Sequence, residues 1–195
     1  MPNVSGVKSK QVVFGTDTDA ISAAGTATTL VLLNSGPWVN AQTVTLTSSA
    51  DNSGITFVVV GKDANGDSAT SAATTGPDTT TLSVAGTWTE VTSITASGAI
   101  TTDISAGITS GATTGIIFAG RTRVRSMTGV AGSGAGTIFI KNGSATSGQN
   151  RLILDVDNGS TIDPYIADDG ILCEDGAYFA SAGTAVVGLS IQFDG

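Results

Sequence analysis

The sequence predicts an all-β protein made of two antiparallel β-sandwich domains, Ig-like or jelly-roll-like, preceded by an extended N-terminal arm. Three observations support this prediction. Short apolar runs rich in β-branched residues, which pack well on pleated sheets, recur along the chain. Turn signals such as Asn65-Gly66 and Asn142-Gly143 separate these runs at the spacing typical of sandwich strands. The one window with helical spacing (Ile100, Ile104 and Ile108) is broken by glycines and filled with threonine, so we expect short strands and turns there.

Residues 1–25 are predicted to form the arm and a first strand. Short apolar pieces alternate there with glycine, serine and aspartate. Met1–Phe14 has no obvious partner strand of its own in the sequence pattern. We therefore expect this segment to extend away from both domains.

Residues 26–120 are predicted to form the Ig-like sandwich. The first strand candidate ends at the turn signal Asn34-Ser35-Gly36-Pro37, and beyond it Val44 and Leu46 alternate with threonines at the period of a strand. A meander from Gly54 to Gly98 follows, in which Asn65-Gly66 favours a two-residue hairpin with both central residues at positive φ. The predicted strands are 28–33, 42–47, 55–60, 79–84, 87–96 and 115–119.

Residues 121–195 are predicted to form a smaller β-sandwich or jelly-roll domain. The boundary is placed near Gly120, where three of the eight basic residues fall within five positions. Asn142-Gly143 and Asn158-Gly159 close two of its strands. The predicted strands are 121–128, 137–141, 151–156, 170–174, 177–179 and 185–193.

The composition is notable for its low charge. Only 12% of the 195 residues are charged, against about 25% in an ordinary globular protein. Such a polar, weakly charged surface can be covered by neighbouring molecules at a small desolvation cost. The alternative explanation is that β-sandwich proteins are simply rich in threonine.

Charge and residue types exclude several classes of function. A net charge of −8 and a pI of about 4.1 argue against a non-specific nucleic-acid binder, which needs clustered cations. The chain has no histidine, no nucleophile–base pair, no phosphate-binding loop and no metal-ligand spacing, so we expect no catalysis and no cofactor. No apolar run approaches the ~20 residues of a membrane span, and the N-terminal stretch lacks the apolar segment of a signal peptide. We therefore expect a soluble protein that is assembled in a reducing cytoplasm.

Two stretches resemble structural proteins of tailed-bacteriophage virions. The first is Gly54–Gly98, with an apolar strand, a D-x-N-G-D turn, G-P-D-T-T-T and V-T-S-I-T-A-S-G. The second lies in 121–195, with a glycine-rich hairpin, R-L-I-L-D, D-G-I-L-C-E-D-G-A-Y-F and V-V-G-L-S-I-Q-F. The resemblance implies a non-enzymatic virion protein, assembled in the host bacterial cytoplasm. Its expected role is a capsid decoration (cement) protein that bridges and stabilises the head shell.

The resemblance also implies partners, namely the major capsid protein or other virion proteins. Cement proteins of this kind often sit on threefold axes, so it further implies a homo-oligomer, with a trimer as the first expectation. Two alternatives remain. One is a tail, neck or fibre component of the same virion, and the other is a carbohydrate-binding or adhesin module in which Trp38 and Trp88 stack on sugars.

The candidate partner-binding residues fall into two groups. An arm can bridge to a neighbour by adding a strand to its sheet, and the residues placed there are Val7, Lys8, Lys10, Val12 and Val13. The second group is Arg121, Arg123 and Arg125, whose alternate spacing puts three guanidiniums on one face of a strand. These arginines can clamp an acidic partner. Alternatively they pair with the chain's own acids, for which the candidates are Asp163, Asp168, Asp169, Glu174 and Asp175.

Other residues have a functional and a structural interpretation. Asp155, Asp157, Asp163, Asp168 and Asp169 can offer oxygen ligands to Ca²⁺, but their loops are better explained by turn formation. Cys173 lies in an apolar run and is predicted to be a buried structural cysteine. Trp38 and Trp88 are predicted to fill the core rather than to form a sugar platform.

Overall fold

The structure is a computed structural model that describes residues 6–13, 15–109, 113–167, 169–182 and 186–195. The described chain is all-β, as predicted, and none of it forms a helix long and apolar enough to cross a membrane. The strands are β1 Val7–Val13, β2 Thr16–Gly25, β3 Thr43–Ser48, β4 Thr56–Asp63, β5 Ser68–Thr70, β6 Thr74–Thr75, β7 Thr81–Ser83, β8 Trp88–Ala96, β9 Ile104–Thr109, β10 Thr114–Phe118, β11 Thr122–Ala131, β12 Gly136–Asn142, β13 Gln149–Val156, β14 Thr161–Ile162, β15 Ile171–Cys173, β16 Ala177–Ala182 and β17 Val186–Asp194.

The chain divides into two compact units. Unit 1 comprises Met1–Phe14, Trp38–Asn40 and Ala112–Gly195, and unit 2 comprises Gly15–Pro37 and Ala41–Gly111. The predicted boundary near Gly120 therefore falls inside unit 1, between β10 and β11. The division also puts β2 in unit 2, whereas the sequence pattern grouped it with the arm.

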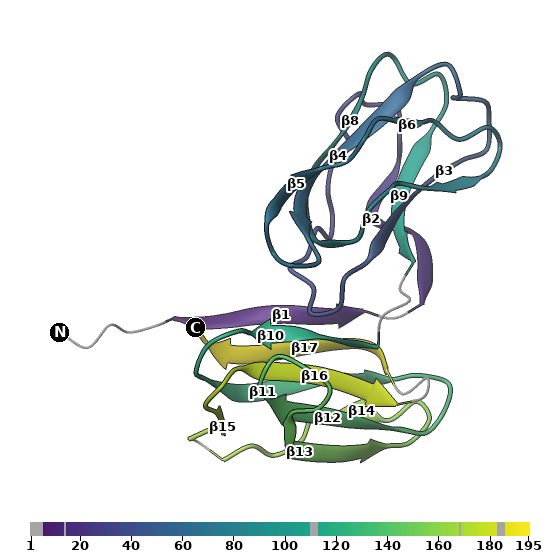
Figure 1. Cartoon of the computed structure of the whole chain (residues 1–195). Helices are drawn as coiled ribbons and strands as arrows, with labels where there is room; N and C mark the ends of the chain where they lie inside the picture. The colour runs from purple at the N-terminus through teal and green to yellow at the C-terminus, as the bar shows by residue number, and fades with distance from the viewer. Residues whose placement is uncertain (1–5, 14, 110–112, 168, 183–185) are drawn as a thin grey trace. The chain divides into compact units, whose positions relative to one another are not determined.

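Unit 1 consists of two antiparallel sheets (Figure 1). One has the order β1-β17-β11-β14, with β15 also paired to β11, and the other has the order β10-β16-β12-β13. The chain changes sheet repeatedly, so that hairpin β12–β13 lies in one sheet while β11 and β14 lie in the other.

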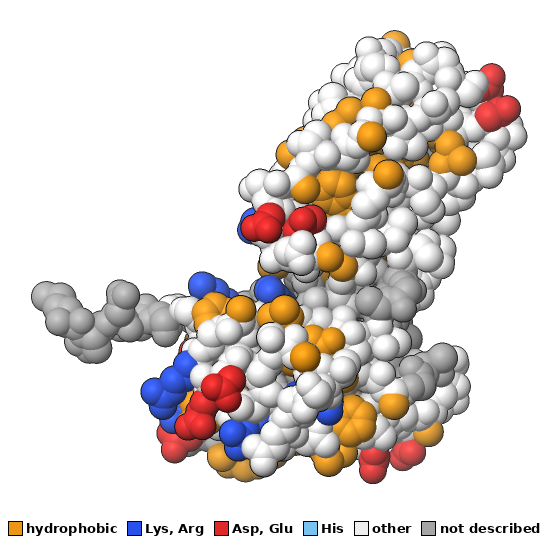
Figure 2. All heavy atoms as spheres, viewed as in Figure 1, with side chains coloured by type: hydrophobic (Ala, Val, Ile, Leu, Met, Phe, Trp, Pro, Cys, Tyr) orange, Lys and Arg blue, Asp and Glu red, His pale blue; other side chains and the backbone are white. Residues whose placement is uncertain are grey.

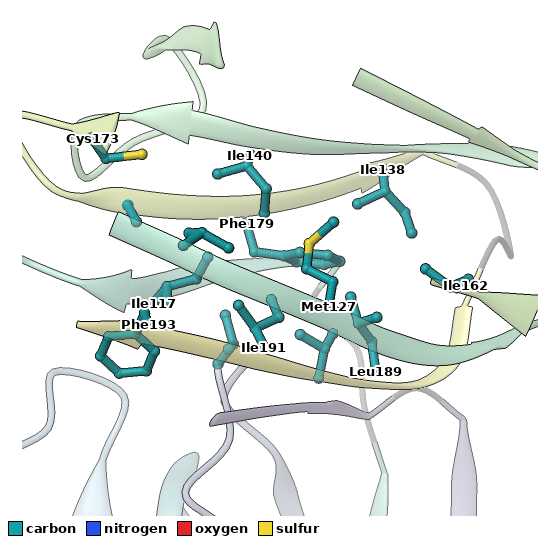
Figure 3. Packing of buried hydrophobic residues seen from close by; sticks show 14 of the residues in the cluster. Ile117, Met127, Ile138, Ile140, Ile162, Cys173, Phe179, Leu189, Ile191 and Phe193 are labelled. Carbon is teal, nitrogen blue, oxygen red and sulfur yellow. The ribbon is translucent and has the colours of Figure 1, made fainter. Parts of the chain in front are cut away.

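The core of unit 1 lies between these sheets, as the alternation of the strands requires. In β12, Ile138 and Ile140 are fully buried, and Met127 of β11 and Phe179 of β16 are buried with them (Figure 3). Each such side chain contributes roughly 1.5–3 kcal/mol by leaving water. The same cluster includes Leu189, Ile191 and Phe193 of β17, which fixes the register of that strand against β11.

Unit 2 has its own pair of antiparallel sheets. One has the order β2-β9-β3-β7, and in the other β4 pairs with β5, β6 and β8. The largest buried side chains of this unit come from both sheets, and they include Ile21, Leu46, Phe57, Ile94 and Ile104. Strand β9 occupies the predicted glycine- and threonine-rich window, so the expectation of a strand rather than a helix there is confirmed.

Two local predictions for unit 2 are wrong. Residues 28–33 do not form a strand. They make one isolated antiparallel bridge to β8, in which Leu30 N donates to Ile94 O and Ala96 N donates to Thr28 O, and Leu33 N donates to Ile21 O. The β4–β5 hairpin does not close through a two-residue turn at Asn65-Gly66 either. Asp63 N donates to Asp67 O, so the loop is residues 64–66, and within it only Gly66 has positive φ. The Asp63 carboxylate accepts the N–H groups of residues 65 and 67.

The predicted lack of a partner strand is also wrong for Val7–Val13, the part of the arm that the structure describes as β1. This strand pairs with β17 over its full length, from Val7 opposite Asp194 to Val13 opposite Gly188. The sequence pattern did not indicate this pairing because the two strands lie at opposite ends of the chain. Residues 1–5 and Phe14 of the proposed arm lie outside the described residues.

Candidate functional site

The candidate partner-binding strand β1 is one edge of its sheet. Its even-numbered residues face the interior of the sandwich, where Val12 is fully buried in the core of unit 1. Lys10 Nζ donates to the carbonyl oxygen of Ile116 at 3.2 Å, and Lys8 Nζ lies 5.8 Å from the centroid of the Phe118 ring. Both lysines thus run across the side of the sandwich from β1 toward β10, with their charged ends near its rim.

The free edge of β1 is closed at its C-terminal half. Gln11 O accepts a bond from Val39 N at 2.6 Å. The fully buried side chain of Asn40 accepts from Val13 N at 3.2 Å and donates to Val13 O at 2.7 Å. The amide of Asn40 thus takes the place of a neighbouring strand for one residue.

The N-terminal half of the same edge is open. Backbone groups of an antiparallel strand point alternately to its two sides, and those of Gln11 and Val13 point away from β17. The backbone groups of Val7 and Ser9 therefore point the same way, and no described residue pairs with them. Val7 is 61% exposed, and the Ser9 hydroxyl lies 3.1 Å from that of Ser190 on β17. The result is a short free edge at which another strand could be added beside Val7 and Ser9.

The structure gives the three predicted arginines different surroundings, although the side chains of Arg123 and Arg125 both lie beside Gly170. Arg125 Nε donates to both carboxylate oxygens of Asp194, and its Nη2 lies 2.6 Å from Asp194 Oδ2. This bond raises the pKa of Arg125 above its ordinary value. Arg123 Nη1 donates to the backbone carbonyl of Asp169 at 2.6 Å, and Arg121 is exposed just before β11.

Two of the three arginines thus make bonds within the chain. Arg125 joins β11 to the end of β17, and Arg123 holds the loop before β15. The alternative that they pair with the chain's own acids is correct for Arg125, although its partner Asp194 was not among the acids considered. Only Arg121 stays fully available at the surface.

Basic residues are nevertheless concentrated in unit 1. Seven of the eight lie there, and unit 2 holds one basic and eight acidic residues, and so seven of the eight net negative charges. In Figure 2 most Lys and Arg side chains lie on unit 1, and much of the visible surface is uncharged. An acidic partner would therefore meet less repulsion at unit 1 than at unit 2.

The remaining candidates have structural positions. Cys173 is fully buried, as predicted, and burial raises the pKa of its thiol. Trp38 and Trp88 are 1% and 2% exposed, so neither indole can stack on a sugar from solvent. Among the residues that the structure describes, no group of three acidic or sulfur side chains is arranged to hold a metal ion, and Asp168 lies outside them.

Sequence reasoning missed the residues that close the β1 edge. Val39 and Asn40 were expected to continue the strand pattern toward residues 42–47, and nothing in their local sequence indicates contact with residues 11 and 13. Asp194 directly follows the last predicted strand, 185–193, and its nearness to Arg125 depends on the pairing of β17 with β11. Comparison of the chain with protein-family models, curated proteins and solved structures finds no significant match.

Proposed function

We propose that this protein is a non-enzymatic structural protein of a tailed-phage virion, and that it acts as a capsid decoration protein that bridges neighbouring subunits of the head shell. The proposal rests on the sequence resemblance and on one structural observation, the half-open edge of β1. A tail, neck or fibre role in the same kind of particle would use the same edge.

The closed half of the edge supports a docking role. Asn40 and Val39 stop strand addition at residue 11, so an incoming strand can pair only with Val7, Ser9 and residues before them. A defined stop limits how far a partner strand can extend along β1, which an edge that is open along its whole length does not do.

The side chains of β1 indicate the chemistry of that partner. A strand added beside β1 places alternate residues next to Lys8 and Lys10 and the others next to Val7 and Ser9. Carboxylates at the first set of positions would meet both ammonium groups at the rim of the sandwich. The best partner is thus an extended segment of the shell with acidic residues at every second position.

Proline substitution tests this edge without disturbing the ladder to β17. The N–H of Ser9 points away from β17, so Ser9→Pro removes a donor that the fold does not use. Ser9→Ala is the matched control, because it also loses the Ser190 contact but keeps the N–H. Co-sedimentation with empty heads of the phage that encodes the chain should show binding of wild type and Ser9→Ala. Ser9→Pro should bind about tenfold more weakly or worse.

Two results would contradict the proposal in different ways. Failure of the wild-type protein to bind heads would exclude the decoration role, and binding to purified tails instead would favour the alternative. Equal binding by Ser9→Pro, with an unchanged circular dichroism spectrum, would exclude the β1 edge as the contact.

A further inference from the structure

Strand β13 is a second edge of unit 1, at the end of the sheet β10-β16-β12-β13. It pairs only with β12, in a register that sets Ile153 opposite Phe139 and Asp155 opposite Thr137. No described residue forms a backbone hydrogen bond with its other side. Strand β15 of the other sheet lies close to β13, but among the described residues it forms no backbone hydrogen bond with the free side of β13.

The exposed face of β13 carries an unusual sequence of side chains. Arg151, Ile153 and Asp155 are exposed, while Leu152 and Leu154 pack against the core of unit 1. Ile153 is 57% exposed, which is high for a large apolar residue in the middle of a strand. Thr137 Oγ1 donates to Asp155 Oδ1 at 2.8 Å and so holds that carboxylate on the face.

This stretch, R-L-I-L-D, is complementary to itself. If two copies pair antiparallel about a twofold axis at Ile153, each residue meets the one equally far on the other side of the axis. Arg151 then faces Asp155 of the second copy, and Asp155 faces Arg151. The two Ile153 side chains meet at the axis, and each has Phe139 beside it on its own sheet.

We propose that unit 1 forms a symmetric dimer through β13, in which the two four-stranded sheets join into one continuous sheet. The occupant of the edge is thus a second copy of this chain. The inference does not depend on the proposed function, and it predicts a dimer where the phage resemblance implies a trimer.

Opposite charge and apolar contact both favour the pairing, but the paired stretch is short. An interface of one strand pair is smaller than the ~1,200–2,000 Å² of standard interfaces, so we expect dissociation in the micromolar range or above. A bulge at Arg151, which has no partner on β12, marks the end of the regular stretch. The pairing should also weaken as salt screens the two charge pairs.

Charge reversal tests the pairing. Arg151→Asp places two aspartates opposite two aspartates of the second copy, and Asp155→Arg places arginines opposite arginines. Each variant alone should associate at least about tenfold more weakly than wild type in sedimentation equilibrium. Mixed together, the two variants are complementary and should form a heterodimer, and the double variant should recover self-association.

The recovery on mixing separates pairing from damage to the fold, because a misfolded variant cannot be rescued by its partner. A wild-type protein that is monomeric at millimolar concentration, or trimeric, would overturn the proposal. So would single variants that associate as well as wild type, or a mixture that associates no better than its components.

Discussion

Cys173 lies in the core of unit 1, and because its thiol titrates it links the stability of that core to pH. Its side chain is buried beside the strand pair β11–β15, where Thr122 is its neighbour in register. Burial raises the pKa of the folded thiol, and nearby Arg151 opposes this effect. As the pH rises past the ordinary thiol pKa of 9.0, the unfolded chain therefore loses its proton first.

Stability should thus fall at alkaline pH because of this one group. Cys173→Ala should cost about 1 kcal/mol at pH 7, where the thiol is protonated in both states. Above pH 9.0 the difference in free energy of unfolding between wild type and variant should shrink, by up to ~1.4 kcal/mol per pH unit. Urea unfolding of both proteins between pH 7 and 10 measures this difference. A constant difference, or a native thiol that reacts rapidly with a disulfide reagent at pH 8, would show that Cys173 is accessible.

For single residues, the sequence predicted which side chains are buried better than it predicted which residues bond to each other. Cys173, Trp38 and Trp88 were expected to be buried because large apolar side chains in strand-rich chains rarely stay in water. The bond from Arg125 to Asp194 and the cap of Asn40 on Val13 depend on the register between distant segments. Local pattern carries no information on that register.

At the level of strands, two elements approach each other so closely that only glycine fits. A Cβ on Gly61 of β4 would lie 2.0 Å from the carbonyl oxygen of Glu90 on β8. Gly61→Ala should therefore force the two backbones apart and cost about 2–3 kcal/mol or more. Gly54→Ala is the control, because its Cβ would meet open space, and it should change stability by less than about 0.5 kcal/mol. Equal chemical-denaturation midpoints for the two variants would refute the close approach.

The strands that the sequence predicted best are β-branched or apolar runs bounded by clear turn signals, such as β8, β12 and β13. Residues 28–33 were predicted as a strand because they are apolar, but their pairing with β8 stops at a single bridge between Thr29 and Thr95. For β1 the prediction failed in the opposite direction, because no partner strand was expected and one exists. A short, charged stretch with weak alternation becomes a strand because β17 offers it a full-length edge.

For the whole molecule, the limits of the two units give a test by fragments. Residues 15–111 contain all of unit 2, whereas the sequence-predicted domain 26–120 lacks β2 and its fully buried Ile21. The first fragment should unfold cooperatively in urea, and the second should be several kcal/mol less stable or unfolded, because β9 loses a neighbour and the core loses a large side chain. A fragment 26–120 as stable as 15–111 would place the boundary where the sequence pattern put it.

The pairing of β1 with β17 also has a consequence for biosynthesis. Ser9 and Ser190, which touch across that pair, are 181 residues apart in the chain. Unit 2 lies wholly between them, so it can fold while the ribosome is still translating unit 1. Strand β1 can pair only after β17 has left the exit tunnel, so its free edge forms late. If this edge binds a partner as we propose, a nascent chain cannot attach through it, and binding is restricted to molecules whose translation has passed β17.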